Sequence, residues 1–201
     1  MRIIKDDKNQ MGTNSYLVIM DNKDCYIIDC PSKLLDFQDV IEKEALNLKY
    51  ILLTHGHFDH IMGATYLRDK YKTKIVAHRE ERSVLIDKNI NLSSMINSPM
   101  EFEADIYLEG KEGIFEDFKY LFTPGHTSGG VSYLVNNCIF TGDTVFYGSI
   151  GRTDFPGGDY ITLINYIEQQ ILTLPLDTII YPGHGQATNV EFEKNNNPFL
   201  K

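Results

Sequence analysis

The sequence predicts an α/β fold, an αββα sandwich in which two mixed β-sheets pack face to face and helices cover their outer faces. Strand-like runs and segments of helical periodicity alternate along the chain. They do so in two successive halves, each of which must bury an apolar sheet face. A length of 201 residues with 42% hydrophobic content also suits one core. We therefore expect a single domain over residues 1–201.

The first half opens with a β-hairpin. Its β-rich runs at 14–20 and 25–29 flank the polar turn Asp-Asn-Lys-Asp. Apolar residues then recur at helical spacing over 32–48, and a strand-like run follows at 50–54. A second segment of helical spacing, 61–72, completes the alternation.

A strand at 74–77 ends this half, and residues 83–104 differ from what precedes them. They are rich in Asn, Ser and Met and weakly periodic, which predicts a loop or an irregular helical excursion. The second half contains one long predicted helix, 159–172, with an inner face formed by Ile161, Ile164, Ile167 and Ile171. Its predicted strands lie at 119–122, 131–135, 138–141 and 178–181.

Composition excludes several classes of partner. The formal net charge is −9 and no Lys/Arg cluster stands out, so nucleic acid or an anionic membrane surface would be repelled. The first ten residues are charged where a signal peptide needs an apolar stretch, and no apolar run approaches the roughly 20 residues that span a bilayer. We expect a cytoplasmic protein that binds neither nucleic acid nor membrane; its oligomeric state stays open. The odd cysteine count without C-x-x-C spacing indicates buried thiols at Cys25, Cys30 and Cys138.

The strongest functional signal is an H-x-H-x-D-H motif formed by His55, His57, Asp59 and His60, directly after an apolar run. At the chain's own His and Asp frequencies, it would arise by chance in about four of ten thousand such sequences. Imidazoles two residues apart on an extended segment can turn to one side, while Asp and His at the start of a helix face a neighbouring point. One segment can therefore serve two adjacent cations, and ions such as Zn²⁺ suit imidazole combined with carboxylate.

Three further candidate ligands follow predicted strands, where a rigid scaffold presents functional groups. They are His126 in Thr-Pro-Gly-His-Thr, Asp143 in Thr-Gly-Asp-Thr and His184 in Pro-Gly-His-Gly. A solitary histidine in such a loop is more often solvated, but five of the six histidines lie at Gly-flanked strand exits. Taken together with the first motif, these residues predict metal binding. The sixth, His78, is expected at the surface or at a sheet edge.

From Asn14 to His184, the sequence resembles the metallo-β-lactamase superfamily. The resemblance implies two divalent ions per chain, zinc with iron or manganese as alternatives. It assigns a first metal to His55, His57 and His126, a second to Asp59, His60 and His184, and a bridging role to Asp143. Asp29 matches the family's remaining motif, which implies support of the ligands; an ordinary turn before Pro31 is the alternative.

The resemblance also separates members of the superfamily. Secreted β-lactamases carry an export signal and usually a Cys where Asp143 stands, and the iron flavoproteins have a Glu where His57 stands. Members that cleave RNA or DNA need a large inserted domain that 201 residues cannot contain. What remains is mainly hydrolysis of thioesters and esters, or sulfur oxidation.

Residues 151–158, Gly-Arg-Thr-Asp-Phe-Pro-Gly-Gly, are similar to the segment that follows the bridging Asp in glyoxalase II-like thioesterases and in persulfide dioxygenases. In glyoxalase II a basic residue there contacts the thiol carrier, and Arg152 occupies that place, with Tyr147 and Phe155 as aromatic partners. Asp154 stands where those enzymes tend to have Tyr, and a loop with a structural Arg–Asp pair is the alternative. The ending Asn-Pro-Phe-Leu resembles short bacterial glyoxalase II-like proteins, and we expect Phe199 and Leu200 to cover the core.

The resemblance implies hydrolysis of a small-molecule hydroxyacyl thioester by a hydroxide shared between two ions, oriented by Asp59, with Asp143 positioning the ions. A persulfide dioxygenase with one iron on His55, His126 and Asp143 is the alternative, and other esters or lactones stay open. A binding protein without activity is disfavoured because every expected ligand is present. Full-length glyoxalase II enzymes continue into a helical region that supplies much of the glutathione contact, whereas 17 residues follow His184. Weak dependence on glutathione is therefore expected.

Overall fold

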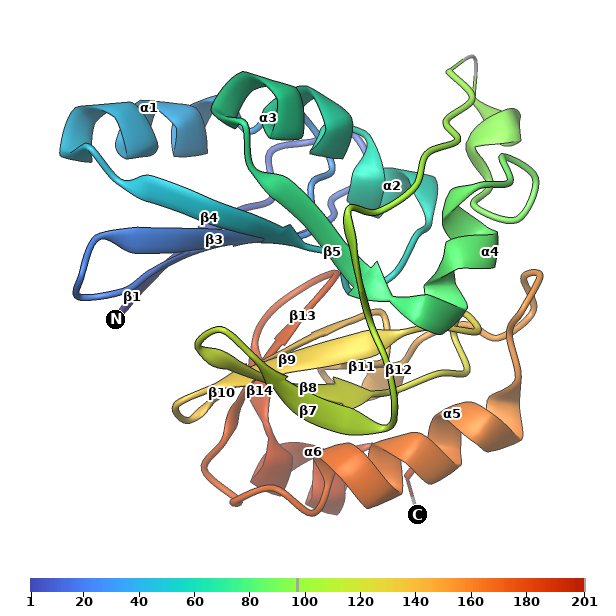
Figure 1. The fold of residues 1–201 in the computed structure, drawn as a ribbon. Helices are drawn as coiled ribbons and strands as arrows, with labels where there is room; N and C mark the ends of the chain where they lie inside the picture. The colour runs from blue at the N-terminus through green and yellow to red at the C-terminus, as the bar shows by residue number, and fades with distance from the viewer. Residues whose placement is uncertain (97, 201) are drawn as a thin grey trace.

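Two six-stranded mixed sheets pack face to face, and helices cover the outer face of each, which confirms the predicted fold class (Figure 1). The computed structural model describes residues 1–96 and 98–200. Residue 97, inside the segment 83–104, lies outside the described residues. Among the helices that are described, none has both the length and the apolar character needed to cross a bilayer.

The first sheet follows the order of the chain, and its connections change from hairpins to crossovers. Its strands are β1 (Arg2–Asp6), β2 (Ser15–Ile19), β3 (Asp24–Ile28), β4 (Asn47–Leu52), β5 (Lys74–His78) and β6 (Ile106–Leu108). The first three pair antiparallel, as the predicted hairpin requires, and the rest pair parallel. Parallel neighbours need a crossover, which helices supply between β3, β4 and β5.

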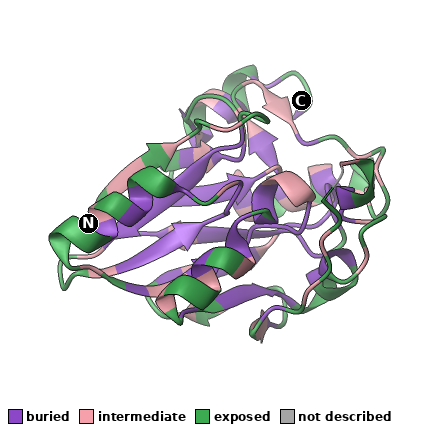
Figure 2. Ribbon diagram, turned by 90° about the horizontal axis from the view of Figure 1, so that it is seen from above, coloured by how far each residue is buried: buried purple, intermediate pink, exposed green. Residues whose placement is uncertain are grey.

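Helices α1 (Leu35–Glu44) and α3 (Ala64–Tyr71) lie on the outer face of the first sheet, while the one-turn helix α2 (Phe58–Ile61) lies at its edge (Figure 1). Seen from above, their outer surfaces are exposed and the strands beneath them are buried (Figure 2). Short helical turns lie before and within the described part of the segment predicted as irregular: η1 (Arg79–Glu81) precedes it, α4 (Arg82–Leu85) overlaps its start and η2 (Ser93–Met95) lies inside it.

The second sheet has the order β14-β13-β10-β9-β8-β7. Its strands are β7 (Glu112–Phe115), β8 (Phe118–Phe122), β9 (Val131–Val135), β10 (Cys138–Gly142), β13 (Ile179–Pro182) and β14 (Thr188–Asn189), and a small ribbon adds β11 (Val145–Phe146) and β12 (Ser149–Ile150). Only β10 and β13 pair parallel, because a helical crossover joins them. The outer face carries α5 (Tyr160–Tyr166), its π-helical continuation η3 (Ile167–Ile171) and α6 (Val190–Asn196).

Buried side chains form three layers, one between the two sheets and one under each set of helices. Because side chains alternate between the faces of a strand, Ile27 packs under the first set of helices while its neighbour Tyr26 packs between the sheets. In the same way Phe140 lies between the sheets and Ile139 under α5. Residues 25–28 of β3 and 138–140 of β10 are therefore apolar at every position, the pattern of a strand covered on both faces.

Some predicted details are wrong at the ends of elements. Ile161 was expected on the inner face of the last helix but is 70% exposed, because it lies on the opposite side of the helix from Leu163, which faces the core. Ile167 and Ile171 are buried in this core as predicted, Ile164 packs against it partly buried, and Leu163 joins them. Leu200 is buried against this layer as expected, whereas Phe199 is 43% exposed. Cys25 and Cys30 are buried free thiols, and Cys138 is partly buried.

Candidate metal centre

The H-x-H-x-D-H motif occupies the junction between β4 and α2. The extended chain after Leu52 carries His55 and His57, and His57 directly precedes the helix, whose first turn holds Asp59 and His60. The three imidazoles are buried. The backbone therefore changes from strand to helix within the motif, which turns its two halves towards different points, as the sequence predicts.

The other three candidates arrive from the facing sheet. His126 follows β8, Asp143 follows β10 and His184 follows β13. The structure brings all seven predicted ligands into one cluster, four from the first half of the chain and three from the second.

Among the described residues, two groups made only of predicted ligands converge within the cluster, and a third group joins Asp29 to His55 and His60. In the first, His55, His57 and His126 place ligand atoms within 4.8 Å of one another, and His57 Nδ1 lies 2.9 Å from His126 Nε2. In the second, Asp59, His60 and His184 do the same, with Asp59 Oδ2 3.3 Å from His184 Nε2 and 3.6 Å from His60 Nε2.

Asp143 lies between the two groups. Its Oδ2 is 3.6 Å from Nε2 of His126, in the first group, and 3.6 Å from Nε2 of His184, in the second. Its Oδ1 is 3.4 Å from His60 Nε2. This is the place of a carboxylate that contacts two ions at once.

Unsatisfied buried atoms indicate that the cluster is built for cations. Within the described residues, His55 Nε2, His57 Nε2, His60 Nε2 and Asp143 Oδ1 are buried without a hydrogen-bond partner. Leaving buried polar atoms unpaired costs about 1–3 kcal/mol each, so four at one place need a functional explanation. Lone pairs of imidazole and carboxylate that converge on one point are the donor set that Zn²⁺ and iron prefer.

The protonation states agree with this interpretation. Burial lowers the pKa of His55 well below its usual range and, with His126 nearby, lowers that of His57 to about 3, so both are neutral donors at pH 7. Burial opposes ionisation of Asp143, but the His60 imidazolium holds its pKa at about 2. Burial likewise disfavours a charge on His60, yet the carboxylates of Asp59, Asp143 and Asp29 raise its pKa well above the usual range. The acidic side of the cluster thus favours a positive charge, either a proton on His60 or a metal ion that takes the place of this proton on Nε2.

Asp29 orients two of the histidines, so the alternative of an ordinary turn residue is wrong. It is buried, and its Oδ2 accepts hydrogen bonds from His60 Nδ1 at 2.8 Å and from Thr54 Oγ1 at 2.7 Å. Since the Thr54 hydroxyl donates to Asp29, it accepts from His55 Nδ1 at 3.2 Å. One carboxylate therefore fixes the tautomers that leave Nε2 of both histidines free for a metal.

Glu81 is a buried residue that the sequence did not reveal. Its Oε1 accepts a hydrogen bond from Gly56 N at 2.7 Å, and its Oε2 accepts from Thr127 Oγ1 and Gly129 N, both at 2.8 Å. It thereby ties the loop of His55 and His57 to the loop of His126. Burial raises its pKa to about 7 against these three donors. The charged run Arg-Glu-Glu-Arg predicts an exposed side chain at this position, and nothing in the pattern indicates that Glu81 is buried.

The segment after Asp143 reaches back to the cluster through its backbone. His126 Nδ1 donates to the carbonyl oxygen of Arg152 at 2.7 Å, which leaves His126 Nε2 free. The Arg152 side chain forms two hydrogen bonds with Asp154, at 2.7 and 2.6 Å, and stacks over the Phe155 ring at 3.8 Å. Phe155 in turn lies edge-on to His57, with 5.8 Å between ring centroids.

A cavity of about 450 Å³ opens beside the ligands and contains two of the three predicted substrate contacts, Arg152 and Phe155. Tyr147 does not line it. Its ring stacks on Phe192, with centroids 4.5 Å apart, because the β11–β12 ribbon carries it towards α6. The structure therefore brings Arg152 and Phe155 to the ligands and leaves Tyr147 outside.

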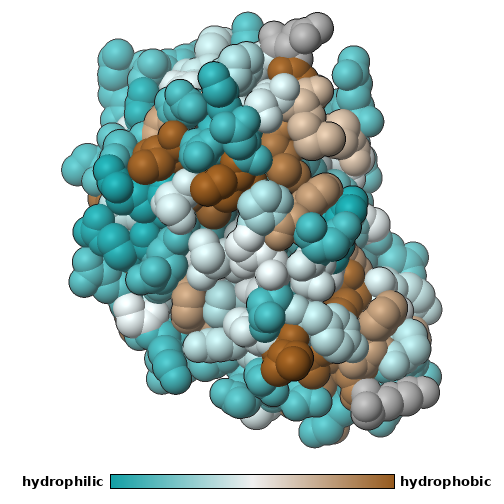
Figure 3. Space-filling view, turned by 90° about the vertical axis from the view of Figure 1, so that its right-hand side faces the viewer, coloured by the Kyte–Doolittle hydropathy of each residue, from teal (hydrophilic) through white to brown (hydrophobic). Residues whose placement is uncertain are grey.

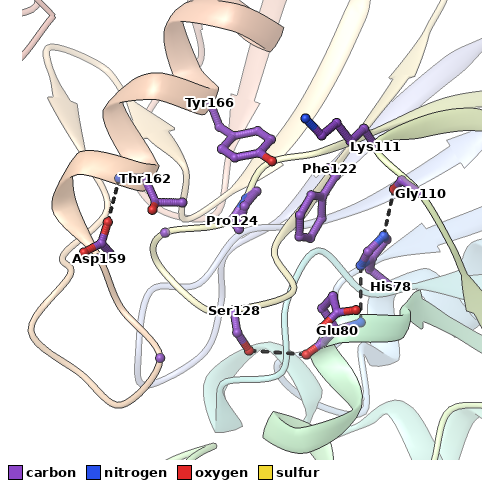
Figure 4. Close-up of a pocket in the computed structure, with 12 residues that line it drawn as sticks. His78, Glu80, Gly110, Lys111, Phe122, Pro124, Ser128, Asp159, Thr162 and Tyr166 are labelled. Atoms are coloured by element: carbon purple, nitrogen blue, oxygen red, sulfur yellow. Dashed lines mark hydrogen bonds between the residues drawn. The ribbon is translucent and has the colours of Figure 1, made fainter.

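A larger cavity, about 620 Å³, lies behind the His126 loop and includes none of the seven ligands (Figure 4). His78 forms part of its wall, and the expectation of a surface or edge role for it is wrong. The side chain is buried, its Nε2 donates to the Gly110 carbonyl at 3.0 Å, and its ring stacks on Phe122 at 4.3 Å. It joins β5 to the start of β7, which is a structural role.

Comparison with known sequences supports this description. The model of the metallo-beta-lactamase superfamily matches residues 9–184. Two curated bacterial proteins are similar over 93% of this chain and 92% of their own length: the probable metallo-hydrolase YqgX of Bacillus subtilis, 38% identical, and the hydroxyacylglutathione hydrolase GloC of Haemophilus influenzae, 37% identical.

Solved structures show the same architecture. The BLEG-1 B3 metallo-beta-lactamase aligns over 100% of both chains with a TM-score of 0.91 and 35% identity. TTHA1623 in a di-iron-bound form has a TM-score of 0.88 and 26% identity, over 98% of this chain and 100% of its own. ETHE1 from Myxococcus xanthus has a TM-score of 0.77 and 26% identity, over 98% of this chain and 84% of its own.

Proposed function

The chain belongs to the metallo-β-lactamase superfamily as a metallo-hydrolase, and from that premise we propose that its substrate is a hydroxyacyl thioester. The observation that carries the proposal is the pair of facing ligand groups with Asp143 between them. A complete second group, including His184, suits a two-ion hydrolase. An oxygenase needs only one iron on two histidines and a carboxylate.

His55, His57 and His126 would hold one ion, Asp59, His60 and His184 would hold the other, and Asp143, which lies between the two groups, would contribute to both. Zinc suits this donor set, and the relative in a di-iron-bound form supports iron as an alternative. Two bound ions supply hydroxide at neutral pH by lowering the pKa of water towards ~7, and they polarise the carbonyl oxygen.

The side chains of the protein would orient the attacking hydroxide. Burial opposes ionisation of Asp59, but His60 and hydrogen bonds from His184 and Thr13 hold its pKa below the usual range. Thr13 Oγ1 donates to its Oδ2 at 2.8 Å, which fixes the carboxylate beside His184. Asp59 is thus an ionised hydrogen-bond acceptor that would orient the hydroxide towards the thioester carbonyl carbon. The carbon–oxygen bond forms, the carbon–sulfur bond breaks, and the thiolate takes up a proton to leave as a thiol.

The likeness to hydroxyacylglutathione hydrolase GloC supports a thioester of an acidic thiol carrier. Among the described residues that line the cavity, Arg152 is the only arginine or lysine, and its guanidinium matches a carboxylate in a bidentate fork. Asp154 now fills that fork, so a carrier carboxylate has to compete with it. This competition supports weak dependence on glutathione.

Hydrolysis and sulfur oxidation differ in their need for oxygen, and this difference tests the proposal. We expect the metal-loaded protein to release thiol from lactoylglutathione without oxygen. Asp143→Asn should abolish the release, and Asp177→Asn, an exposed control carboxylate, should retain it. Oxygen uptake on glutathione persulfide, without anaerobic thiol release, would instead establish a persulfide dioxygenase.

A further inference from the structure

An apolar groove adjoins the cavity beside the ligands. This second cavity has a volume of about 380 Å³, and three side chains, Met11, Phe58 and Ile96, line both spaces. The two cavities therefore meet along these residues. Beyond them the second cavity is bounded by the apolar Met62 and Pro31 and, at its rim, by the polar residues Lys8, Asn9, Gln10 and Ser32. We call Met11, Phe58, Met62 and Ile96 the methionine groove.

The exposure of these side chains indicates a binding surface. Met11 is 49% exposed and Met62 44%, and Met95, which lines the neighbouring cavity, is 74% exposed. Grouped apolar side chains left in water mark sites that a ligand covers. Methionine is unbranched and flexible, so it adapts to chains of different length. Figure 3 shows tan and brown side chains gathered in the upper part of one face of the molecule, among white and teal ones.

The groove and the polar contacts leave the ligand cluster in different directions. Phe58 directly precedes Asp59, so the groove begins at the second ligand group. Arg152 and Phe155 line the cavity beside the ligands but not the methionine groove, and they lie against His126 and His57 of the first ligand group. A thioester whose carbonyl lies between the groups can place its thiol portion beside Arg152 and its acyl chain towards Met11.

The positive charge at the far end of the groove, that of Lys8, is paired with a carboxylate of the protein itself. Lys8 lines the second cavity, and its ammonium pairs with Asp36 at 2.7 Å, so it does not call for an anionic ligand. An aliphatic chain suits such a lining better than the polar arm of a peptide-like thiol.

We propose that the methionine groove binds the aliphatic acyl chain of the substrate, so that the preferred thioesters carry an acyl group of several carbons. The inference rests on the proposed hydrolysis of acyl thioesters and extends it to a substrate class. Each methylene that enters the groove adds binding, by up to roughly fourfold in affinity when it is fully buried.

The test compares straight-chain acyl thioesters of N-acetylcysteamine, from acetyl to decanoyl, on three metal-loaded proteins. In the wild type we expect kcat/KM to rise by roughly two- to fourfold per methylene until the groove is filled. Met62→Glu places a charge in the groove and should lower the decanoyl-to-acetyl ratio by at least about tenfold. Ile114→Glu changes an apolar residue that is 73% exposed on β7, outside both cavities, and should keep the wild-type ratio.

The outcomes separate this inference from the proposed function. Cleavage with the same ratio in all three proteins would overturn the groove and leave the hydrolase intact. If no thioester is cleaved, the proposed function fails, and the groove is then tested separately by measuring the binding of decanoate with calorimetry. Decanoate that binds Met62→Glu more weakly than it binds the wild type and Ile114→Glu supports the groove. Equal affinity for all three proteins overturns the groove.

Discussion

Among single residues, Asp143 contacts histidines of both ligand groups, whereas His184 belongs to one. We expect Asp143→Ala to weaken both metals together and His184→Ala to weaken mainly the second. Outer partners of ligands already contribute 10–100-fold to metal affinity, so loss of a direct ligand should cost more than about a hundredfold. Metal titration of the chelated variants measures this. Equal losses confined to one site would contradict the bridging position of Asp143.

Glu81 gives the protein a pH dependence that can be isolated by substitution. Burial raises its pKa to about 7 in the folded chain, above its ordinary value of 4.5. Between these values the folded state binds a proton that the unfolded state does not. The contribution of Glu81 to the free energy of unfolding is therefore complete below pH about 4.5 and is lost as the pH rises through about 7.

We expect the free energy of unfolding of the wild type, relative to Glu81→Gln, to fall by on the order of 2–4 kcal/mol between pH 4.5 and 8. Urea denaturation of both metal-free proteins measures it, and the titrating histidines cancel in the difference. Parallel curves would show that the three hydrogen-bond donors keep Glu81 ionised throughout.

How far single residues can be predicted depends on whether their role is local. The motif of His55, His57, Asp59 and His60 can be recognised from the sequence, because all four residues lie in one short segment. Glu81 acts on Gly56 and Gly129, which lie far from it in sequence, and its role exists only after the sheets pack. Tyr147 was expected as an aromatic partner of Arg152, but it lies in the turn between β11 and β12 and stacks on Phe192.

At the scale of elements, buried strands could be predicted and edge elements could not. Val131–Val135 forms β9 with the predicted bounds, because both faces are covered and every position favours a strand. Edge strand β1 and helix α6 combine charged and apolar residues without a strong period, and no strand or helix was predicted at either. The ends of strands carry the ligands, so the predicted strands were enough to place the candidate site.

The loop after β13 has no room for a side chain at Gly183. A Cβ there would lie 2.2 Å from Asp143 Oδ1 and 2.8 Å from His60 Cε1. We expect Gly183→Ala to displace Asp143 and weaken metal binding at least tenfold, because a bridging carboxylate has to keep its position. Elemental analysis after dialysis measures the loss.

Gly185→Ala is the matched control in the same loop. Nothing lies within 4 Å of its Cβ, but its φ of +78° strains an alanine. It should cost roughly 1–2 kcal/mol of stability and leave metal content unchanged. Full metal content in Gly183→Ala would contradict the close packing of this loop on Asp143.

For the molecule as a whole, the candidate metal centre joins the two halves of the chain. One half supplies the ligands from His55 to His60, and the other supplies His126, Asp143 and His184. Ions that bind only the folded state stabilise it by about 2.7 kcal/mol per site at a hundredfold excess over Kd. For a chain of this size, two sites should raise the melting temperature by on the order of 10–20 °C.

Scanning calorimetry with and without a chelator tests this expectation. The metal-loaded protein should unfold in one transition at the higher temperature, and the chelated protein at the lower one. A melting temperature that does not respond to the chelator would show that no ion joins the halves.

The parallel pairing of β10 with β13 also determines at which stage of folding the complete set of metal ligands is assembled. Asp143 and His184 become neighbours only after the helix between these strands has crossed the sheet. A growing chain on the ribosome therefore offers four ligands on a flexible segment, where raw affinity would favour copper over zinc or iron. The paired geometry exists only in the finished fold. We therefore expect the choice of metal to be made after synthesis, by coordination geometry and by the ions then available.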